Sequence, residues 1–428
     1  MKKLLVMSVL VLSYGLAQGA ETMDLPPQEQ ALAAVRAHPQ VRAALAGMHA
    51  AQAQRDGLTA GPHELTLRAM EQSRKDRSVD QRYREHEIGI ERSLRLPGKA
   101  VLDAELGAAG LEVARHALGD SLHAVSRELL ARWFAWQREA AAVADWQAQV
   151  ALLTDLDAAV RKKVGAGETA RLEAMLINAQ LKQAEAQLAQ ARARRERVAL
   201  EWRQHFPAIR LPDAPLLVTP LPIDAMPEAL ARWHDRILAE NHELAVARTE
   251  ARRARLAAAR AEAERRPDPT VGLTLGSERD GQERLIGLHL SIPLPGEARA
   301  ASARAASAEA EAAAARESLA LVRAEAEARQ VVVAASEAYE QWRRFDEVAR
   351  QMEENARLVE RAWRLGEGQY ADLQAARRQA IEARLSASQA LLDANEARYR
   401  LLLDAHELWD FEIETGFAEG DKPSLSQR

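Results

Sequence analysis

Few residue patterns in this sequence could carry chemistry, and the first is a glycine-rich turn. Gly165-Ala166-Gly167-Glu168-Thr169-Ala170 fits the Gly-x-Gly-x-x-Ala pattern of a dinucleotide-binding loop. That pattern needs a preceding strand in a β-α-β unit, whereas a long stretch of helical character precedes it here. The sequence also contains no serine elbow, phosphate-binding loop or zinc-protease motif. We therefore expect neither a bound nucleotide nor an enzyme.

Residues that bind metals are sparse. The 11 histidines are scattered, there are 8 methionines, and cysteine is absent. Without cysteine the chain has no disulfide, no thiolate metal site and no lipid attached to an N-terminal cysteine. We therefore predict no resident metal and no cofactor.

Carboxylates gather at two Gly-x-Gly turns. Glu168 and Glu173 follow the first turn, and Glu367 and Asp372 lie in or after the second. In an oligomer with threefold symmetry an inward-facing carboxylate becomes a ring, and such rings favour cations. The alternative is that each is an ordinary solvated surface charge.

The two turns belong to a duplicated chain. The segments 89–100 (GIERSLRLPGKA) and 287–298 (GLHLSIPLPGEA) share Gly, Ser, Leu-Pro-Gly and Ala, 198 residues apart. The segments 162–174 and 363–375 share the Gly-x-Gly turn, 201 residues apart. Similar segments that occur in the same order indicate a tandem repeat of a unit of roughly 200 residues.

Prolines separate the repeats. We assign residues 21–206 to the first repeat and 228–409 to the second. The connector, 207–227, holds six prolines and cannot be regular helix. Residues 410–428 lose periodicity and are expected to form a loosely ordered tail.

Alternating apolar and polar residues predict four strands. The predicted strands are 64–70, 87–96, 270–276 and 284–294. Each has one apolar side, which Arg92 interrupts in the second strand. The polar segments 71–85 and 277–283 are expected to be exposed hairpin loops.

Long helical stretches fill the rest. We expect one helix over 27–60, then long helices over 98–164 and 296–365, each followed by a return helix, 168–206 or 369–409. A helix over 98–164 would span about 100 Å. Each repeat therefore has the order helix-strand-strand-helix-helix, a mostly α fold with a small β part.

This architecture requires several chains. Helices of such length need neighbours along their whole length. Four strands leave open edges, which are costly in lipid, and closed bacterial barrels have at least about eight strands. Two copies would supply eight strands and three would supply twelve, so the sequence predicts an oligomer without fixing its size.

The first 20 residues are typical of a secretory signal peptide. Lys2 and Lys3 precede an apolar run over 4–12, and small residues occupy 17–20. The run is too short for an ordinary transmembrane helix, although an uncleaved anchor is the alternative. The net charge of −5 becomes about −7 without the two lysines, which argues against nucleic acid as a partner.

The sequence resembles the TolC family of outer-membrane efflux proteins. The resemblance rests on the duplicated Leu-Pro-Gly, the strands before it, and the Gly-x-Gly turns followed by Leu172 and Leu373. It implies a homotrimer with a 12-stranded outer-membrane β-barrel, continued across the periplasm by an α-helical barrel. It also implies a passive exit duct that docks onto a periplasmic adaptor and an inner-membrane pump.

In its length, its lack of a lipid-accepting cysteine and its Leu-Pro-Gly-Lys segment, the chain is most similar within that family to the CzcC-like branch. That similarity implies a pump of the resistance-nodulation-division class and heavy-metal cargo. Gly98-Lys99-Ala100 departs from the Gly-Lys-Arg often found in that branch. The resemblance assigns the following residues to the adaptor contact and periplasmic mouth: Gly165, Gly167, Glu168, Gly366, Glu367, Gly368 and Asp372. It assigns the following to the junction of barrel and helices: Leu96, Pro97, Gly98, Leu294, Pro295 and Gly296.

The main alternative is a periplasmic coiled-coil adaptor or scaffold that never enters a membrane. The two predicted β-hairpins with an apolar side distinguish the channel from that alternative. An exported enzyme would need a convergent polar pocket, which long uninterrupted helices do not offer.

Overall fold

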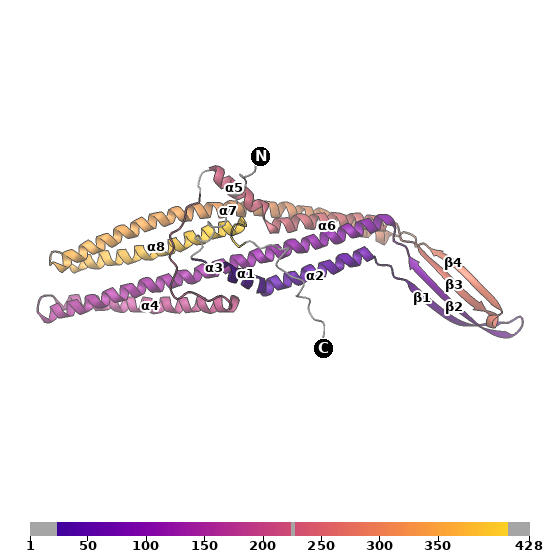
Figure 1. The fold of residues 1–428 in the computed structure, drawn as a ribbon, viewed down its shortest axis with the longest axis horizontal. Coiled ribbons are helices and arrows are strands. Elements are labelled where there is room, and N and C mark those ends of the chain that lie inside the picture. The colour runs from indigo at the N-terminus through magenta and orange to yellow at the C-terminus, as the bar shows by residue number, and fades with distance from the viewer. Residues whose placement is uncertain (1–23, 224–226, 410–428) are drawn as a thin grey trace, which may run out of the picture. The chain divides into compact units, whose positions relative to one another are not determined.

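The computed structural model describes residues 24–223 and 227–409. The predicted signal peptide and the predicted tail lie outside these residues. The fold is mostly helical with one small antiparallel sheet, as predicted (Figure 1). The helices are α1 (Gln28–Ala37), α2 (Pro39–Ala60), α3 (Pro97–Gly165), α4 (Arg171–His205), α5 (Pro227–Ala239), α6 (His242–Glu264), α7 (Glu297–Arg364) and α8 (Tyr370–Asp404). The strands are β1 (Thr66–Asp76), β2 (Gln81–Ser93), β3 (Thr270–Glu278) and β4 (Glu283–Ser291), with a short 3₁₀ turn, η1 (Arg279–Gly281).

The long helices match their predicted spans to within a few residues. α3 has 69 residues and α7 has 68, while α4 and α8 have 35 each. The prediction of a single helix over 27–60 is wrong, because the chain breaks between α1 and α2. His38 takes an extended conformation with ψ of 138°, since the ring of the following Pro39 disfavours the helical conformation there.

The chain divides into two compact units, described separately below. The helical unit comprises residues 24–41, 122–240 and 326–409, and the sheet unit comprises 42–121 and 241–325. α3 and α7 each contribute one part to each unit.

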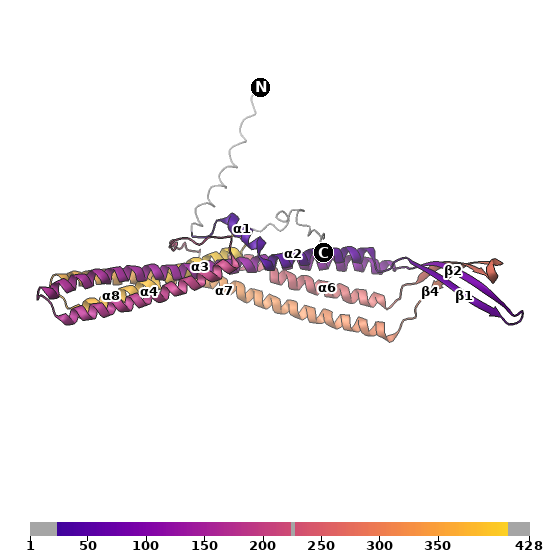
Figure 2. The same cartoon turned by 90° about the horizontal axis from the view of Figure 1, so that it is seen from below.

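In the helical unit, two helical hairpins pack side by side (Figures 1 and 2). α3 packs on α4 through small clusters, among them one of Val143, Leu188 and Ala191. α7 packs on α8 through alanines, among them Ala356 and Ala376. Alanine at these contacts lets helix backbones approach closely, which explains the high alanine content.

Ion pairs join the two hairpins. Arg138 of α3 binds Asp393 of α8 at 2.6 Å, and Asp145 of α3 accepts from Arg384 of α8 at 2.8 Å. The start of the described chain also binds both helices, because Asp24 accepts hydrogen bonds from Trp133 and Tyr399 at 2.7 and 2.5 Å.

The proline-rich connector lies against the same helices. Residues 207–223 contain no helix or strand, as predicted, but Pro227, the predicted last residue of the connector, begins α5. The backbone N–H of Leu216 donates to the side chain of Gln137 on α3 at 2.9 Å. The Asn395 amide on α8 donates to the carbonyl of Val218 at 2.7 Å. The connector therefore bridges α3 and α8, which belong to different hairpins.

In the sheet unit, the four strands pair in the order β1-β2-β3-β4, all antiparallel. Their existence and order along the chain match the prediction, but the predicted loop over 71–85 is wrong. Residues 71–76 and 81–85 continue the strands, and only 77–80 connect them. The second hairpin is also tighter than expected, since β3 reaches Glu278 and β4 begins at Glu283.

No helix within 24–223 or 227–409 combines the length and apolar character that crossing a membrane would require.

Candidate functional site

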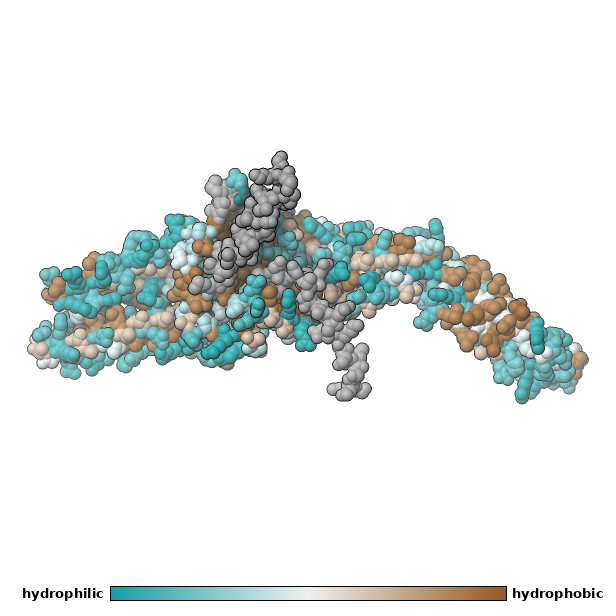
Figure 3. Space-filling model, in the orientation of Figure 1, coloured by the Kyte–Doolittle hydropathy of each residue, from teal (hydrophilic) through white to brown (hydrophobic). Residues whose placement is uncertain are grey.

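The sheet has one apolar face, and this face is exposed. The register sets Leu67 opposite Ile90, Ile90 opposite Leu273, and Leu273 opposite Leu288. Leu288 is 84% exposed. The next row consists of Ala69, Ile88, Leu275 and Ile286. Figure 3 shows the resulting brown patch on the sheet. A contiguous apolar surface of this kind marks contact with a membrane or another protein.

The opposite face carries glycines and polar side chains. A Cβ on Gly272 would lie 2.2 Å from Cε1 of His289, and a Cβ on Gly89 would lie 2.9 Å from Cγ2 of Thr274. His289 in turn contacts Glu91 at 3.1 Å. Glycine is therefore needed at these positions because neighbouring polar side chains fill the space above them.

Arg92, which interrupts the apolar face in the sequence, has a local partner. Its Nε donates to the backbone carbonyl of His63 at 3.2 Å. It lies near the helical end of β2, where it faces Val271 of β3. Val271 pairs in turn with Leu290, so the charge of Arg92 lies within an apolar row of this face.

Farther toward the hairpin tips both faces become polar. Glu85 is buried between Gln72 and Arg74, at 2.8 and 3.0 Å. The hydrophilic end of the sheet is coloured teal in Figure 3. The sheet therefore has an apolar band next to the helices and a charged end beyond it.

The outer edges of the sheet belong to β1 and β4. Within the described residues, each of these strands pairs on one side only. Unpaired edge groups readily pair with another chain. A single chain therefore presents an incomplete sheet with two open edges.

The first Leu-Pro-Gly segment lies where the sheet meets the helices. α3 begins at Pro97, where proline is favoured because its missing N–H would have no helical partner. Lys99 follows and is 1% exposed. Its Nζ lies 2.9 Å from Asp268 and 3.0 Å from Glu264. The junction is therefore closed by a buried cation between two carboxylates.

Asp268 is the centre of this junction. It also accepts from His63 at 2.8 Å and from the backbone N–H of Leu96 at 3.2 Å. Burial alone would raise the pKa of Asp268, but the hydrogen bonds from His63, Lys99 and Leu96 outweigh it and lower the pKa to about 2.

The second Leu-Pro-Gly segment is built differently. α7 begins at Glu297, directly after Gly296, and Leu294 is 89% exposed. Arg299 reaches back to Glu264 at 2.5 Å. Neither Gly98 nor Gly296 has an atom within 4 Å of a Cβ placed on it, so crowding does not explain either glycine.

The two Gly-x-Gly turns end α3 and α7 with the same backbone motif. Gly167 and Gly366 have positive φ, 78° and 81°. Glu168 N–H donates to the carbonyl of Lys163 at 2.9 Å, and Glu367 N–H donates to that of Ala362 at 3.0 Å. This is the Schellman arrangement, in which a left-handed glycine stops a helix.

The equivalent positions in the two turns differ from those that the sequence predicts. The left-handed glycines, Gly167 and Gly366, are 199 residues apart, and so are the starts of α4 and α8. The predicted offset of 201 pairs the wrong glycines. It also pairs Leu172, which is 63% exposed, with Leu373, which is 1% exposed. The left-handed glycines and the helix starts both give an offset of 199, which the spacing of the glycines alone does not reveal.

The two turns lie at one end of the helical unit and share a core. Val160 and Ile177 of the first hairpin pack with Trp363, Tyr370 and Leu373 of the second. Burial, together with the nearby charge of Glu173, raises the pKa of Tyr370 to about 12. The structure thus brings together the two turns that the family resemblance assigns to the periplasmic mouth.

Carboxylates at these turns differ in their partners. Glu173 accepts from the Thr169 hydroxyl at 2.8 Å. Glu168, Glu367 and Asp372 are exposed. Asp372 lies in the first turn of α8, where the helix dipole favours an anion, and no ion pair to it occurs within 24–223 or 227–409.

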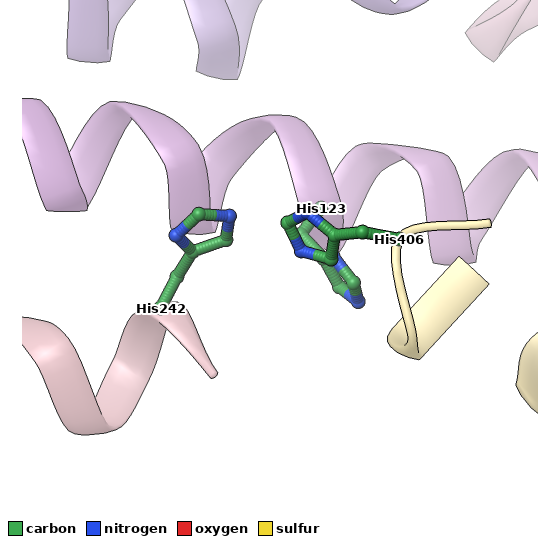
Figure 4. Close-up of side chains that lie close together, drawn as sticks. All are labelled: His123, His242 and His406. Atoms are coloured by element: carbon green, nitrogen blue, oxygen red, sulfur yellow. The ribbon is translucent and has the colours of Figure 1, made fainter. Parts of the chain in front are cut away.

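Sequence reasoning missed how the histidines gather. His123 and His406 stack with ring centroids 5.4 Å apart (Figure 4). His38 and His205 lie close together with Glu128. These partners are far apart in the sequence, so their spacing gives no signal, and only the packing of the hairpins brings them together.

No protein-family model matches the sequence, and no curated protein matches it. Solved structures do match in fold. The CmeC outer membrane channel of Campylobacter jejuni has a TM-score of 0.73 at 13% identity, over 90% of this chain and 86% of that one. The MtrE outer membrane channel of Neisseria gonorrhoeae, in its open state, gives 0.72 at 17% identity, over 90% and 89%. The outer membrane protein VceC of Vibrio cholerae gives 0.71 at 16%, over 88% and 95%. The chain therefore has the fold of these outer membrane proteins.

Proposed function

We propose that the mature chain, after removal of residues 1–20, is an outer-membrane channel subunit and a passive exit duct, without enzymatic activity. The observation that carries this proposal is the exposed apolar face of a sheet with two open edges. Water disfavours that face, and lipid accepts it only if the open edges pair with other chains. Three copies supply twelve strands and close a barrel.

The long hairpins continue the barrel into the periplasm. α3 and α7 are long enough to span about 100 Å each, and their exposed side chains pack against the next copy. The likeness in fold to CmeC and MtrE, both outer membrane channels, supports this arrangement.

The ends of the helical hairpins form the periplasmic mouth. The turns around Gly167 and Gly366 contact a periplasmic adaptor, which connects the duct to an inner-membrane pump. Asp372 is exposed at this end and has an unpaired carboxylate within the described residues. Three copies of it form an acidic ring that favours cations.

The cargo is a heavy-metal cation, exported by a pump of the resistance-nodulation-division class. The resemblance of the Leu-Pro-Gly-Lys segment to the CzcC-like branch supports this cargo, and so do the carboxylates at the mouth. Deletion of the protein should then increase sensitivity to zinc, cobalt or cadmium. Increased sensitivity to organic toxicants alone would rule out metal as the cargo.

A pair of leucine variants tests the membrane location. Leu288 and Leu285 lie on the same strand but on opposite faces, at 84% and 48% exposure. Leu288→Arg should abolish the heat-modifiable outer-membrane oligomer, because an arginine facing lipid near the bilayer centre costs about 2–4 kcal/mol. Leu285→Arg should leave the oligomer intact. If both variants assemble equally, or if the wild-type chain is a water-soluble monomer, the duct proposal fails.

A further inference from the structure

Three side chains from separate elements converge in the helical unit. His38 lies between α1 and α2, Glu128 is on α3, and His205 is the last residue of α4. One ligating atom from each lies within 4.8 Å of the others. Nδ1 of His205 is 3.0 Å from Oε1 of Glu128. All three side chains are partly buried.

Two imidazoles and one carboxylate match the donor set of a zinc site. Zn²⁺ binds histidine nitrogen and carboxylate oxygen at about 2.0–2.2 Å, commonly with three protein ligands and a water. A cation replacing the proton between His205 and Glu128 would have both donor atoms already in place. The donor atom of His38 lies within 4.8 Å of both.

An aromatic ring backs the two histidines. Phe206 is 1% exposed, and its ring centroid lies 6.0 Å from that of His38 and 6.4 Å from that of His205. Phe206 is itself held against Trp202, at 5.2 Å between centroids. The imidazoles therefore share one rigid apolar wall, which limits their rotation and excludes some of the competing water.

Two existing contacts compete with a metal, and both can be released. Arg132 Nε lies 2.7 Å from Oε1 of Glu128, but its Nη1 is already 3.6 Å from Glu201. The guanidinium can therefore move to a second carboxylate. The backbone N–H of Gln40 donates to His38 Nδ1 at 3.3 Å, a long and weak hydrogen bond.

We propose that His38, Glu128 and His205 bind a divalent transition-metal ion of the zinc type. The ion would link the residue between α1 and α2 to α3 and α4, the helices of the first hairpin. This site lies within the helical unit of one chain and does not depend on the chain being a channel. A failure of either proposal therefore leaves the other intact.

The experiment uses the purified mature chain, stripped with EDTA and then titrated with ZnCl₂ and, as a spectroscopic probe, CoCl₂. The wild type should retain zinc after gel filtration and develop the visible absorption of cobalt with nitrogen and oxygen ligands. Changing a ligand should weaken the zinc affinity at least about 100-fold, since losing an outer-shell partner alone costs 10- to 100-fold. His205→Gln and Glu128→Gln are the two ligand variants.

His49→Gln is the matched control, because His49 is exposed on α2 and outside the site. A His406→Gln background removes zinc bound at the stacked pair. In that background, His205→Gln should lose one zinc per chain and the cobalt band, whereas His49→Gln should keep both. Arg132→Gln should bind zinc more tightly, since it removes the competing cation. The proposal is overturned if the wild type gives no cobalt band, or if His205→Gln and Glu128→Gln bind zinc as well as the control does.

Discussion

Nζ of Lys99 lies 2.9 Å from Oδ1 of Asp268 and so connects the start of α3 to the residues that lead into β3. The Lys99 side chain is 1% exposed and the Asp268 side chain 8%. The sheet is therefore joined to α3 through a buried ion pair between residues far apart in the sequence.

Lys99→Met should destabilise the protein strongly. The substitution leaves Asp268 buried without its main cation, and breaking one side of a buried pair costs about 3–5 kcal/mol. Equilibrium unfolding of the purified protein in urea measures the loss. Lys182→Met is the control, since Lys182 is 65% exposed beside Glu185 and such a pair is worth less than about 1 kcal/mol. Equal losses in the two variants would refute a structural role for the junction.

Alanine at Gly167 should destabilise the protein, whereas alanine at Gly165 should not. Gly167 has φ of 78°, so Gly167→Ala should cost about 1–2 kcal/mol, the penalty of the left-handed conformation. Gly165 ends α3 and has no atom within 4 Å of an added Cβ. Gly165→Ala should therefore be neutral or stabilise by up to about 1 kcal/mol. Thermal unfolding compares the two, and a loss in both would show that the turn is not the Schellman motif described.

Stability should fall in acid through Asp404. Burial opposes its ionisation, but a hydrogen bond from His123 and the charges of Arg127 and Arg400 lower the pKa of Asp404 from 3.8 to about 2. A carboxylate with a lowered pKa stabilises the fold fully above its unfolded value, and this contribution is lost as the pH falls through about 2.

Asp404→Asn should therefore reduce the free energy of unfolding at about pH 6 and make its decline between about pH 4 and 2 less steep. The measurement is urea unfolding at a series of pH values. Asp372→Asn serves as the control, because Asp372 is exposed. If the variant has the same dependence of stability on pH as the wild type, Asp404 does not contribute to the loss of stability in acid.

The sequence predicts the helices and strands well but the ends of the strands less well. The apolar sides of the strands, such as Leu67, Ile88 and Leu273, were correctly placed on one face because strand periodicity is strictly two. The extension of β1 to Asp76 was missed because its last residues are polar and lack the apolar alternation. Those residues pair because the neighbouring strand continues, which is a tertiary effect.

The two helix-ending turns were located correctly in the sequence but aligned incorrectly. Glycine spacing alone suggested equivalence of Gly165 with Gly366, whereas the left-handed conformation belongs to Gly167 and Gly366. The histidine cluster at His38 and His205 could not be predicted, since long-range packing of the helices creates it. Motif spacing reports local backbone geometry, not contacts between distant elements.

Asp372→Ala should change the conductance of the reconstituted channel. In the proposed trimeric duct this change removes three carboxylates from the proposed mouth, which should reduce cation selectivity and weaken block by divalent cations. Single-channel recording in planar bilayers measures both. Asp213→Ala is the control, because Asp213 is 97% exposed in the connector, away from the mouth. Unchanged selectivity and block in Asp372→Ala would show that Asp372 does not line the pore.

The proposed contact between the apolar face of the sheet and lipid is tested by the environment of that face in a bilayer. Because the chain has no cysteine, Leu288→Cys and Leu285→Cys can each be labelled at a single site with a polarity-sensitive fluorophore. In reconstituted vesicles, brominated lipid should quench the label at position 288 and aqueous iodide should quench the label at position 285. Quenching of the label at position 288 by iodide, with no effect of brominated lipid, would contradict the claim that this face meets the membrane.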